Sequence, residues 1–143
     1  MAKFNENGFN LEYPDEWEIE YDEESGHDLT LYSSNGAFWT LTRRPGYVEP
    51  DELLKESVEA LTSEYEDAEV STAMEEYHQR RLDGFDVDFF YLDLPCMAML
   101  RTIRFGIYTY LIYVQTMDQS TSMLDELKEI TRFWTEHLEM IDF

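Results

Sequence analysis

Apolar residues occupy most positions from Ile107 to Thr116, a segment that reads IYTYLIYVQT. β-branched and aromatic residues fill most of it, which is typical of strands. A period of two places Tyr108, Tyr110, Ile112 and Val114 on one face, and Ile107, Thr109, Leu111 and Tyr113 on the other. Because both sets are largely apolar, the pattern predicts a strand in the middle of a sheet that is covered on both sides.

Shorter alternating runs predict further strands in the first third of the chain. They are Phe9 to Tyr13, which stops at Pro14, and a run with Trp17, Ile19 and Tyr21 on its apolar side. Asp28 to Ser33 and Ala37 to Thr42 then flank Asn35-Gly36. Asn-Gly between alternating runs predicts a hairpin with a type I′ turn, in which both central residues have positive φ.

Three more strands are expected after residue 69. They are Val70 to Leu82, Phe85 to Leu94 and Met97 to Phe105, with Asp83-Gly84 as a hairpin turn and Pro95 ending the second strand. No segment between them is long enough for a parallel crossover, so we expect an antiparallel meander.

Two segments have helical periodicity. Pro50 to Glu66 carries one apolar stripe, and its proline suits a first helical position. Near the end of the chain, Ser122 to Asp125 fits a capping box. A second stripe follows, made of Leu127, Ile130, Trp134 and Leu138.

These elements predict an α+β fold. With 143 residues, of which 43% are hydrophobic, the chain is expected to form one domain over residues 1–143 with a core of its own. The expected architecture is an α/β/α sandwich, in which a mainly antiparallel sheet of six to seven strands lies between two main helices.

The net charge limits the partners. Against 32 Asp and Glu there are 10 Lys and Arg, which gives −22. A field of this sign repels nucleic acid and anionic membranes, and it leaves open a basic protein partner, a cationic ligand or a role in solubility alone. Without a signal-peptide core or an apolar window of membrane-spanning length, a cytoplasmic location is the expectation.

Residue types that carry chemistry do not form a catalytic motif. The histidines, His27, His78 and His137, come from separate segments and lack zinc-ligand spacing. The acidic run Asp83, Asp86, Asp88 and Asp93 lacks the glycine and the bidentate glutamate of a calcium loop. Cys96 is alone and is expected to be a small buried hydrophobe. We therefore expect a non-enzymatic protein without a cofactor or metal.

The arginines are the strongest binding candidates. Six lie on or beside predicted strands, namely Arg43, Arg44, Arg80, Arg81, Arg101 and Arg104. Each can pair with a nearby carboxylate such as Glu75 or Asp86, and an exposed pair contributes less than about 1 kcal/mol. Alternatively, two or three converge into a pocket for a carboxylate or phosphate. The candidate site residues are Arg43, Arg44, Arg80 and Arg81, at the strand ends.

The order of these segments resembles the PsbP-like superfamily. The shared features are FNLEYPDEW at the start, a glycine-containing strand LDGFDVDFF, and YLIYVQTMD leading into a helix that contains FWTEHL. That superfamily includes a photosystem II extrinsic subunit, a Ran-binding nuclear-import factor and bacterial proteins of unassigned role. The resemblance implies an antiparallel sheet between helices and a non-enzymatic binding or assembly role.

Three functional hypotheses follow. The first is a binding or accessory protein whose acidic surface meets a basic partner. The second is a small-molecule binder that holds an anion or carboxylate in a pocket of sheet aromatics and arginines. The third is a salt-adapted protein whose acidity serves solvation only, in line with its having just three lysines.

The third hypothesis predicts that molar KCl stabilises the protein. Salt screens repulsion among the carboxylates, so the melting temperature should rise as KCl increases. Differential scanning calorimetry at low and molar KCl measures this. A melting temperature that stays constant or falls would show that the acidity is not a salt adaptation.

Overall fold

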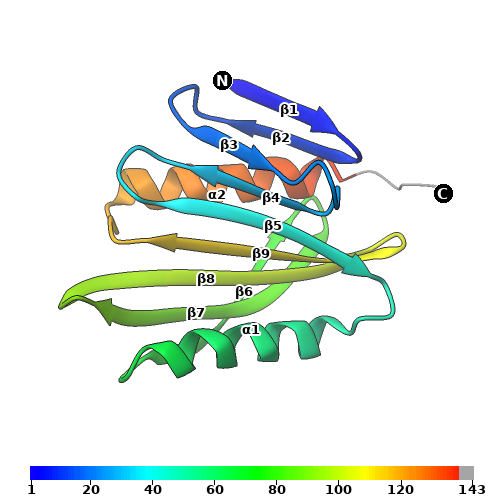
Figure 1. The fold of residues 1–143 in the computed structure, drawn as a ribbon. Coiled ribbons are helices and arrows are strands. Elements are labelled where there is room, and N and C mark those ends of the chain that lie inside the picture. Colours follow the sequence, from blue (N-terminus) through cyan, green and yellow to red (C-terminus); the bar gives the residue numbers. More distant parts are fainter. Residues whose placement is uncertain (139–143) are drawn as a thin grey trace.

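The computed structural model describes residues 1–138, which form nine strands and two helices. In chain order they are β1 (Ala2–Glu6), β2 (Phe9–Tyr13), β3 (Glu18–Tyr21), β4 (Asp28–Tyr32), β5 (Phe38–Pro45), α1 (Pro50–Glu64), β6 (Glu69–Tyr77), β7 (Arg80–Tyr91), β8 (Leu94–Phe105), β9 (Tyr108–Thr116) and α2 (Thr121–Glu136) (Figure 1). No helix in this range is long and apolar enough to cross a membrane.

Seven of the strands form one sheet, in the order β3-β4-β5-β9-β8-β7-β6. Every neighbouring pair is antiparallel. β1 and β2 pair only with each other, and β2 lies against α2 (Figure 1). The predicted α+β fold with a mainly antiparallel sheet and two helices is confirmed.

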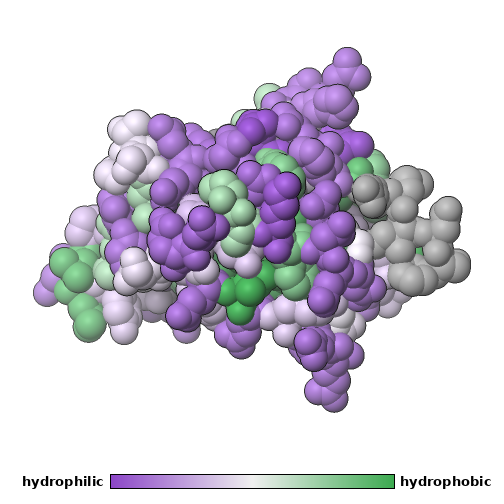
Figure 2. Space-filling model, turned by 90° about the horizontal axis from the view of Figure 1, so that it is seen from above, coloured by the Kyte–Doolittle hydropathy of each residue, from purple (hydrophilic) through white to green (hydrophobic). Residues whose placement is uncertain are grey.

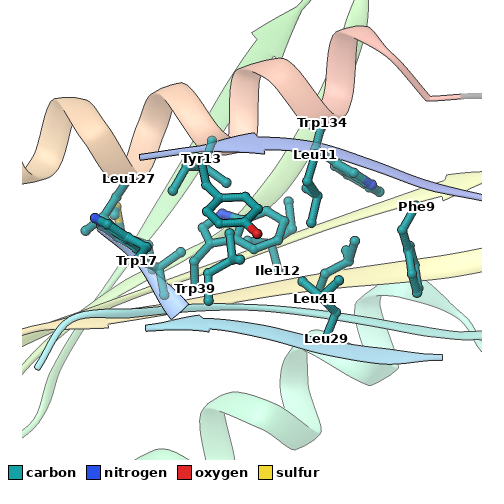
Figure 3. Close-up of a cluster of buried hydrophobic side chains, with 14 of the residues drawn as sticks. Phe9, Leu11, Tyr13, Trp17, Leu29, Trp39, Leu41, Ile112, Leu127 and Trp134 are labelled. Carbon is teal, nitrogen blue, oxygen red and sulfur yellow. The ribbon is translucent and has the colours of Figure 1, made fainter. Parts of the chain in front are cut away.

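The central strand is β9, as predicted. Tyr110, Ile112 and Val114 belong to a buried cluster that includes α2 and β2. Figure 3 shows part of this cluster, where side chains from β2, the sheet and α2 meet. The alternate residues Leu111 and Tyr113 face a second cluster that includes α1. Each face of β9 is therefore covered by a different helix.

The helix boundaries differ slightly from the prediction. α1 ends at Glu64 rather than Glu66. α2 is capped by Ser120, whose hydroxyl accepts a hydrogen bond from the Met123 amide, so the predicted capping box at Ser122 is wrong. The Asp118 carboxylate accepts from the Ser120 amide and holds the turn that places this cap. The predicted stripe, with Leu127 and Trp134 among its residues, is buried.

The prediction of a turn at Asp83-Gly84 is wrong. Both residues lie inside β7, and the turn between β6 and β7 is His78-Gln79, with φ of 53° and 63°. Gly84 faces Arg101 across the ladder, and a Cβ atom on it would lie 1.7 Å from the Leu100 carbonyl oxygen. The glycine is therefore needed because two backbones approach closely. In the sequence, a glycine needed for this reason looks the same as a glycine in a turn.

The prediction that Pro95 ends a strand is also wrong. Pro95 pairs with Phe90 inside the β7–β8 hairpin, whose turn is Leu92-Asp93 with φ of 50° and 64°. β9 pairs with β8 only from Met97 onward. Pro95 therefore has a strand on one side only, where its missing N–H leaves no ladder bond unmade.

The Asn35-Gly36 hairpin is confirmed, but its turn is not type I′. Only Gly36 has positive φ, 89°, and the Ser33 amide donates to the Ala37 carbonyl across a three-residue loop. Such a loop combines a turn with one left-handed residue. Asn7-Gly8 has positive φ at both residues, 50° and 84°, and joins β1 to β2. Neither this turn nor β1 was among the predicted elements.

Gly84→Ala tests the close approach of β7 and β8. The added methyl group has no room, so we expect the free energy of unfolding to fall by about 1–3 kcal/mol or more. Ser71→Thr adds a methyl group at an exposed position on β6 and serves as the control. Urea unfolding measures both variants. Equal stability of the two would contradict the contact.

Candidate functional site

Two of the four candidate arginines form exposed ion pairs. Arg44 Nη1 lies 3.6 Å from a carboxylate oxygen of Asp28, and Arg81 Nε lies 2.7 Å from one of Asp83. These are the neighbouring-carboxylate pairs of the first interpretation. Both are solvent-exposed, so each contributes little to stability.

Arg80 stabilises the end of α2. Its Nη1 donates to the Thr135 carbonyl at 2.6 Å and to the Glu136 carbonyl at 3.3 Å, while its guanidinium carbon lies 4.8 Å from the centre of the Phe105 ring. The last carbonyls of a helix lack partners within the helix and carry partial negative charge. Arg80 therefore has a structural role that ties β7 to the C-terminal turn of α2.

Arg43 is almost fully buried, with 1% of its surface exposed. Its Nε donates to Nδ1 of His27 at 2.9 Å, and its Nη2 donates to the Gly26 carbonyl at 2.9 Å. The guanidinium carbon lies 4.3 Å from the centre of the Phe9 ring and 4.6 Å from that of Tyr108. Because Nδ1 of His27 accepts, the proton of the neutral ring is on Nε2.

The four arginines do not share one pocket. Consecutive strand residues point to opposite faces, so Arg43 and Arg44 diverge, as do Arg80 and Arg81. Arg43 contacts Tyr108, which pairs with Phe105, the ring under Arg80. Arg43 and Arg80 therefore lie on the same face of the sheet with an aromatic pair between them.

A fifth arginine forms the most buried ion-pair cluster in residues 1–138. Arg101 is 4% exposed, and it donates to Glu75 and to Asp86 at 2.8 Å each. Tyr77 donates to the same Glu75, and burial, reinforced by that carboxylate, raises the pKa of Tyr77. Arg101 thus links β6, β7 and β8. The prediction that arginines on the strands pair with nearby carboxylates such as Glu75 and Asp86 is confirmed here. Each guanidinium nitrogen of Arg101 has a hydrogen-bond partner.

Residues 1–138 contain no group of three or more His, Cys, Asp or Glu side chains that could hold a metal ion. Cys96 is 2% exposed, with its Sγ 3.6 Å from the Leu94 carbonyl, which confirms the prediction of a buried cysteine. A buried thiol of this kind is inert.

A groove of about 830 Å³ lies between α1 and the strands β6 and β7. Apolar side chains from all three elements line it, namely Leu54, Val58, Met74 and Phe85. Charged residues surround them, namely Asp51, Lys55, Glu59, Arg81 and Asp83. Of the four candidate arginines, only Arg81 borders this groove.

The groove exists because α1 covers only part of its face of the sheet. Leu54 and Leu61 of α1 pack in a cluster with residues of β7, β8 and β9, and β6 contributes nothing to that cluster. Met74 on β6 is therefore 51% exposed. The groove was not predicted from the sequence, because the period of Val70 to Leu82 does not reveal which part of this face of the sheet lacks a helix.

Exposed apolar residues also gather at the β7–β8 hairpin. Phe90, Tyr91, Leu92 and Leu94 are 61%, 50%, 78% and 51% exposed. In Figure 2 this hairpin lies at the left end, where it forms one of several hydrophobic patches on a mostly hydrophilic face. Tyr91 contacts Tyr65 just past α1, with ring centres 6.3 Å apart, so the apolar surface continues from α1 to the hairpin.

No protein-family model matches the sequence. No curated protein matches it either. The fold is similar to that of a Bacteroides thetaiotaomicron protein, with a TM-score of 0.63 and 14% identity over 91% of this chain and 46% of that one. The chain therefore spans about half the length of that protein.

The fold is also similar to PA94 from Pseudomonas aeruginosa, a protein described as of unknown function and as a suggested regulator. The TM-score is 0.53, with 12% identity over 100% of this chain and 99% of that one. At such identities both similarities show the fold alone, because proteins with unrelated functions can share a fold.

His27→Phe tests the bond that holds Arg43. The phenyl ring keeps the packing but removes the acceptor for Arg43 Nε, so we expect a loss of about 1–3 kcal/mol in the free energy of unfolding. In an Arg43→Met background the same change should cost nearly nothing, since the donor is gone. His137→Phe, at an exposed histidine, is the control. Urea unfolding of the four combinations gives the coupling energy, and equal losses in both backgrounds would contradict the bond.

Proposed function

We propose that this chain is a non-enzymatic binding or accessory protein that holds a basic, amphipathic segment of a partner protein in the groove between α1 and β6–β7. The observation that carries the proposal is an apolar groove in a protein of net charge −22. The proposal includes the α/β/α sandwich of the PsbP-like superfamily. It is supported by two helices that contact alternate residues of β9.

The apolar floor selects the kind of ligand. Binding clefts in proteins typically enclose about 300–1,000 Å³, and this groove lies within that range. Leu54 and Val58 are one helical turn apart, and they face Met74 and Phe85 across the groove. Apolar side chains on one face of a partner helix or strand would remove this surface from water, which is the main favourable term in association.

The charged residues around the groove favour a partner segment of positive charge. Arg81 is already paired with Asp83, so Lys55 is the one other cation among the residues that line the groove, against the two carboxylates of Asp51 and Glu59. The exposed side of α1 adds Glu52 and Glu56. Lysines and arginines beside the apolar face of a partner segment would meet these carboxylates, and the net charge would speed their encounter.

Met74→Asp tests the groove. The probe is a fluorescein-labelled synthetic helix of leucine and lysine with one apolar face, and binding is followed by fluorescence anisotropy. A charge on the apolar floor should raise the Kd about tenfold or more, which corresponds to about 1.4 kcal/mol of lost binding energy.

Met117→Asp is the matched control, because Met117 is similarly exposed, at 46%, and lies outside the groove. It adds the same charge and should leave the Kd unchanged. Higher salt should weaken binding by the wild type and by the Met117→Asp variant. The groove is not the binding site if both variants bind as tightly as the wild type, or if both lose affinity equally.

A further inference from the structure

β6 is an open edge of the seven-stranded sheet. It is the last strand in the sheet order, and its ladder with β7 runs without a bulge from Glu69, opposite Asp88, to Tyr77, opposite Arg80. Within residues 1–138, no backbone hydrogen bond joins β6 to any element except β7. Because backbone groups point alternately to the two sides of a strand, every second N–H and C=O of β6 points outward without a strand to pair with.

β6 lacks most of the features that protect such edges. Edge strands in natural proteins are typically short, carry lysine or proline, contain a bulge, or lie under a helix or loop. The other edge strand of the sheet, β3, has only four residues. β6 has nine residues, EVSTAMEEY, without lysine or proline, and six of the nine are exposed. A long edge of this kind is suited to pairing with a strand of another chain.

The charges on this edge favour a basic strand. Glu69 lies directly opposite Asp88, and both residues are exposed. Like charges at such positions destabilise a pair of strands. Neither carboxylate forms an ion pair within residues 1–138. A lysine or arginine on an added strand would offset this repulsion, whereas a second copy of this chain, with its charge of −22, would increase it.

The two faces of β6 favour alternating residues in the added strand. Val70 and Met74, which are 43% and 51% exposed, share one face, and Met74 lines the groove beside α1. Glu69 lies on the opposite face, because consecutive residues of a strand point to opposite sides. Neighbouring strands place side chains of the same face next to each other. Apolar residues therefore suit the face toward α1, and basic residues suit the face of Glu69.

We infer that the partner segment binds as an extended strand along the outer edge of β6, with apolar residues toward α1 alternating with lysines or arginines on the other face. The inference rests on the proposed function, since it gives the conformation of the same basic segment. Backbone hydrogen bonds to β6 provide affinity in this mode, and the alternating side chains provide specificity. A helix in the groove would instead leave the outward backbone groups of β6 in water.

N-methylated peptides test the backbone pairing. The probe is a fluorescein-labelled peptide of alternating valine and lysine, as long as β6. Two further versions carry N-methyl groups, one on every valine amide and the other on every lysine amide. Both keep the side chains, and each blocks the N–H groups along one edge of the peptide strand. Only one edge of a bound strand faces β6, so fluorescence anisotropy should show one version binding at least about tenfold more weakly than the other.

Hydrogen exchange of the β6 amides, followed by NMR, is the second readout. In the free protein the outward amides of β6 should exchange fast, because water reaches them. Binding of the unmethylated peptide should protect these alternate amides, which a helix in the groove would leave unprotected. The inference is overturned if β6 gains no such protection, or if the two methylated peptides bind equally well.

Glu69→Lys tests the charge on the edge. The change places a cation where the bound strand carries its own, so the Kd of the valine–lysine peptide should rise about tenfold. Glu18→Lys is the matched control, because it changes the net charge equally at an exposed glutamate on the other edge strand, β3. The control should change the Kd by less than about twofold in high salt, where long-range repulsion is screened. Equal effects of the two variants in high salt would overturn the inference.

The inference and the proposed function fail in different ways. If Met74→Asp weakens binding of the helical probe while the valine–lysine peptide fails the tests above, the groove is the binding site and the strand inference is wrong. If neither peptide binds, the proposed function is wrong and the inference is overturned with it.

Discussion

The fold depends on the burial of β9 on both faces. A strand whose two faces are both largely apolar is stable in water only when both faces of its sheet are covered. Tyr110 and Ile112 require cover on one side, and Leu111 and Tyr113 require it on the other. α2 and the β1–β2 pair cover the face with Tyr110 and Ile112, and α1 covers the face with Leu111 and Tyr113. The antiparallel strands on either side of β9 complete the sheet.

The two faces are covered unequally, and the binding surface results from that difference. α2 and β2 bury a continuous cluster over β4, β5 and β9. α1 is a single helix and covers mainly β8 and β9, so part of β6 and β7 stays open. These strands are attached through their backbone ladders, and Arg101 on β8 adds ion pairs to Glu75 on β6 and Asp86 on β7. The ion pairs reinforce the part of the sheet that α1 leaves open.

The arginines divide according to burial. Arg44, Arg81 and Arg104 pair with acids at the surface, where water weakens the attraction. Arg43 and Arg101 are buried, and there each polar group needs a partner. Arg101 has two carboxylates, whereas Arg43 has aromatic rings, a histidine and a carbonyl. Neighbours in the sequence such as Arg43 and Arg44 therefore have different roles.

Local pattern by itself determined the two helices, the central position of β9, and the strands whose faces alternate cleanly. The period of the apolar residues indicates which side of a segment is buried, and it can be read within each segment separately. The turns after β6 and β7 were decided by tertiary structure. Gly84 is required by the close approach of the β8 backbone, and Pro95 is tolerated because β9 does not pair with β8 at that position. The groove and the surroundings of Arg43 also depend on segments distant in sequence. Phe9, His27 and Tyr108 meet one guanidinium only after the sheet and the β1–β2 pair have formed.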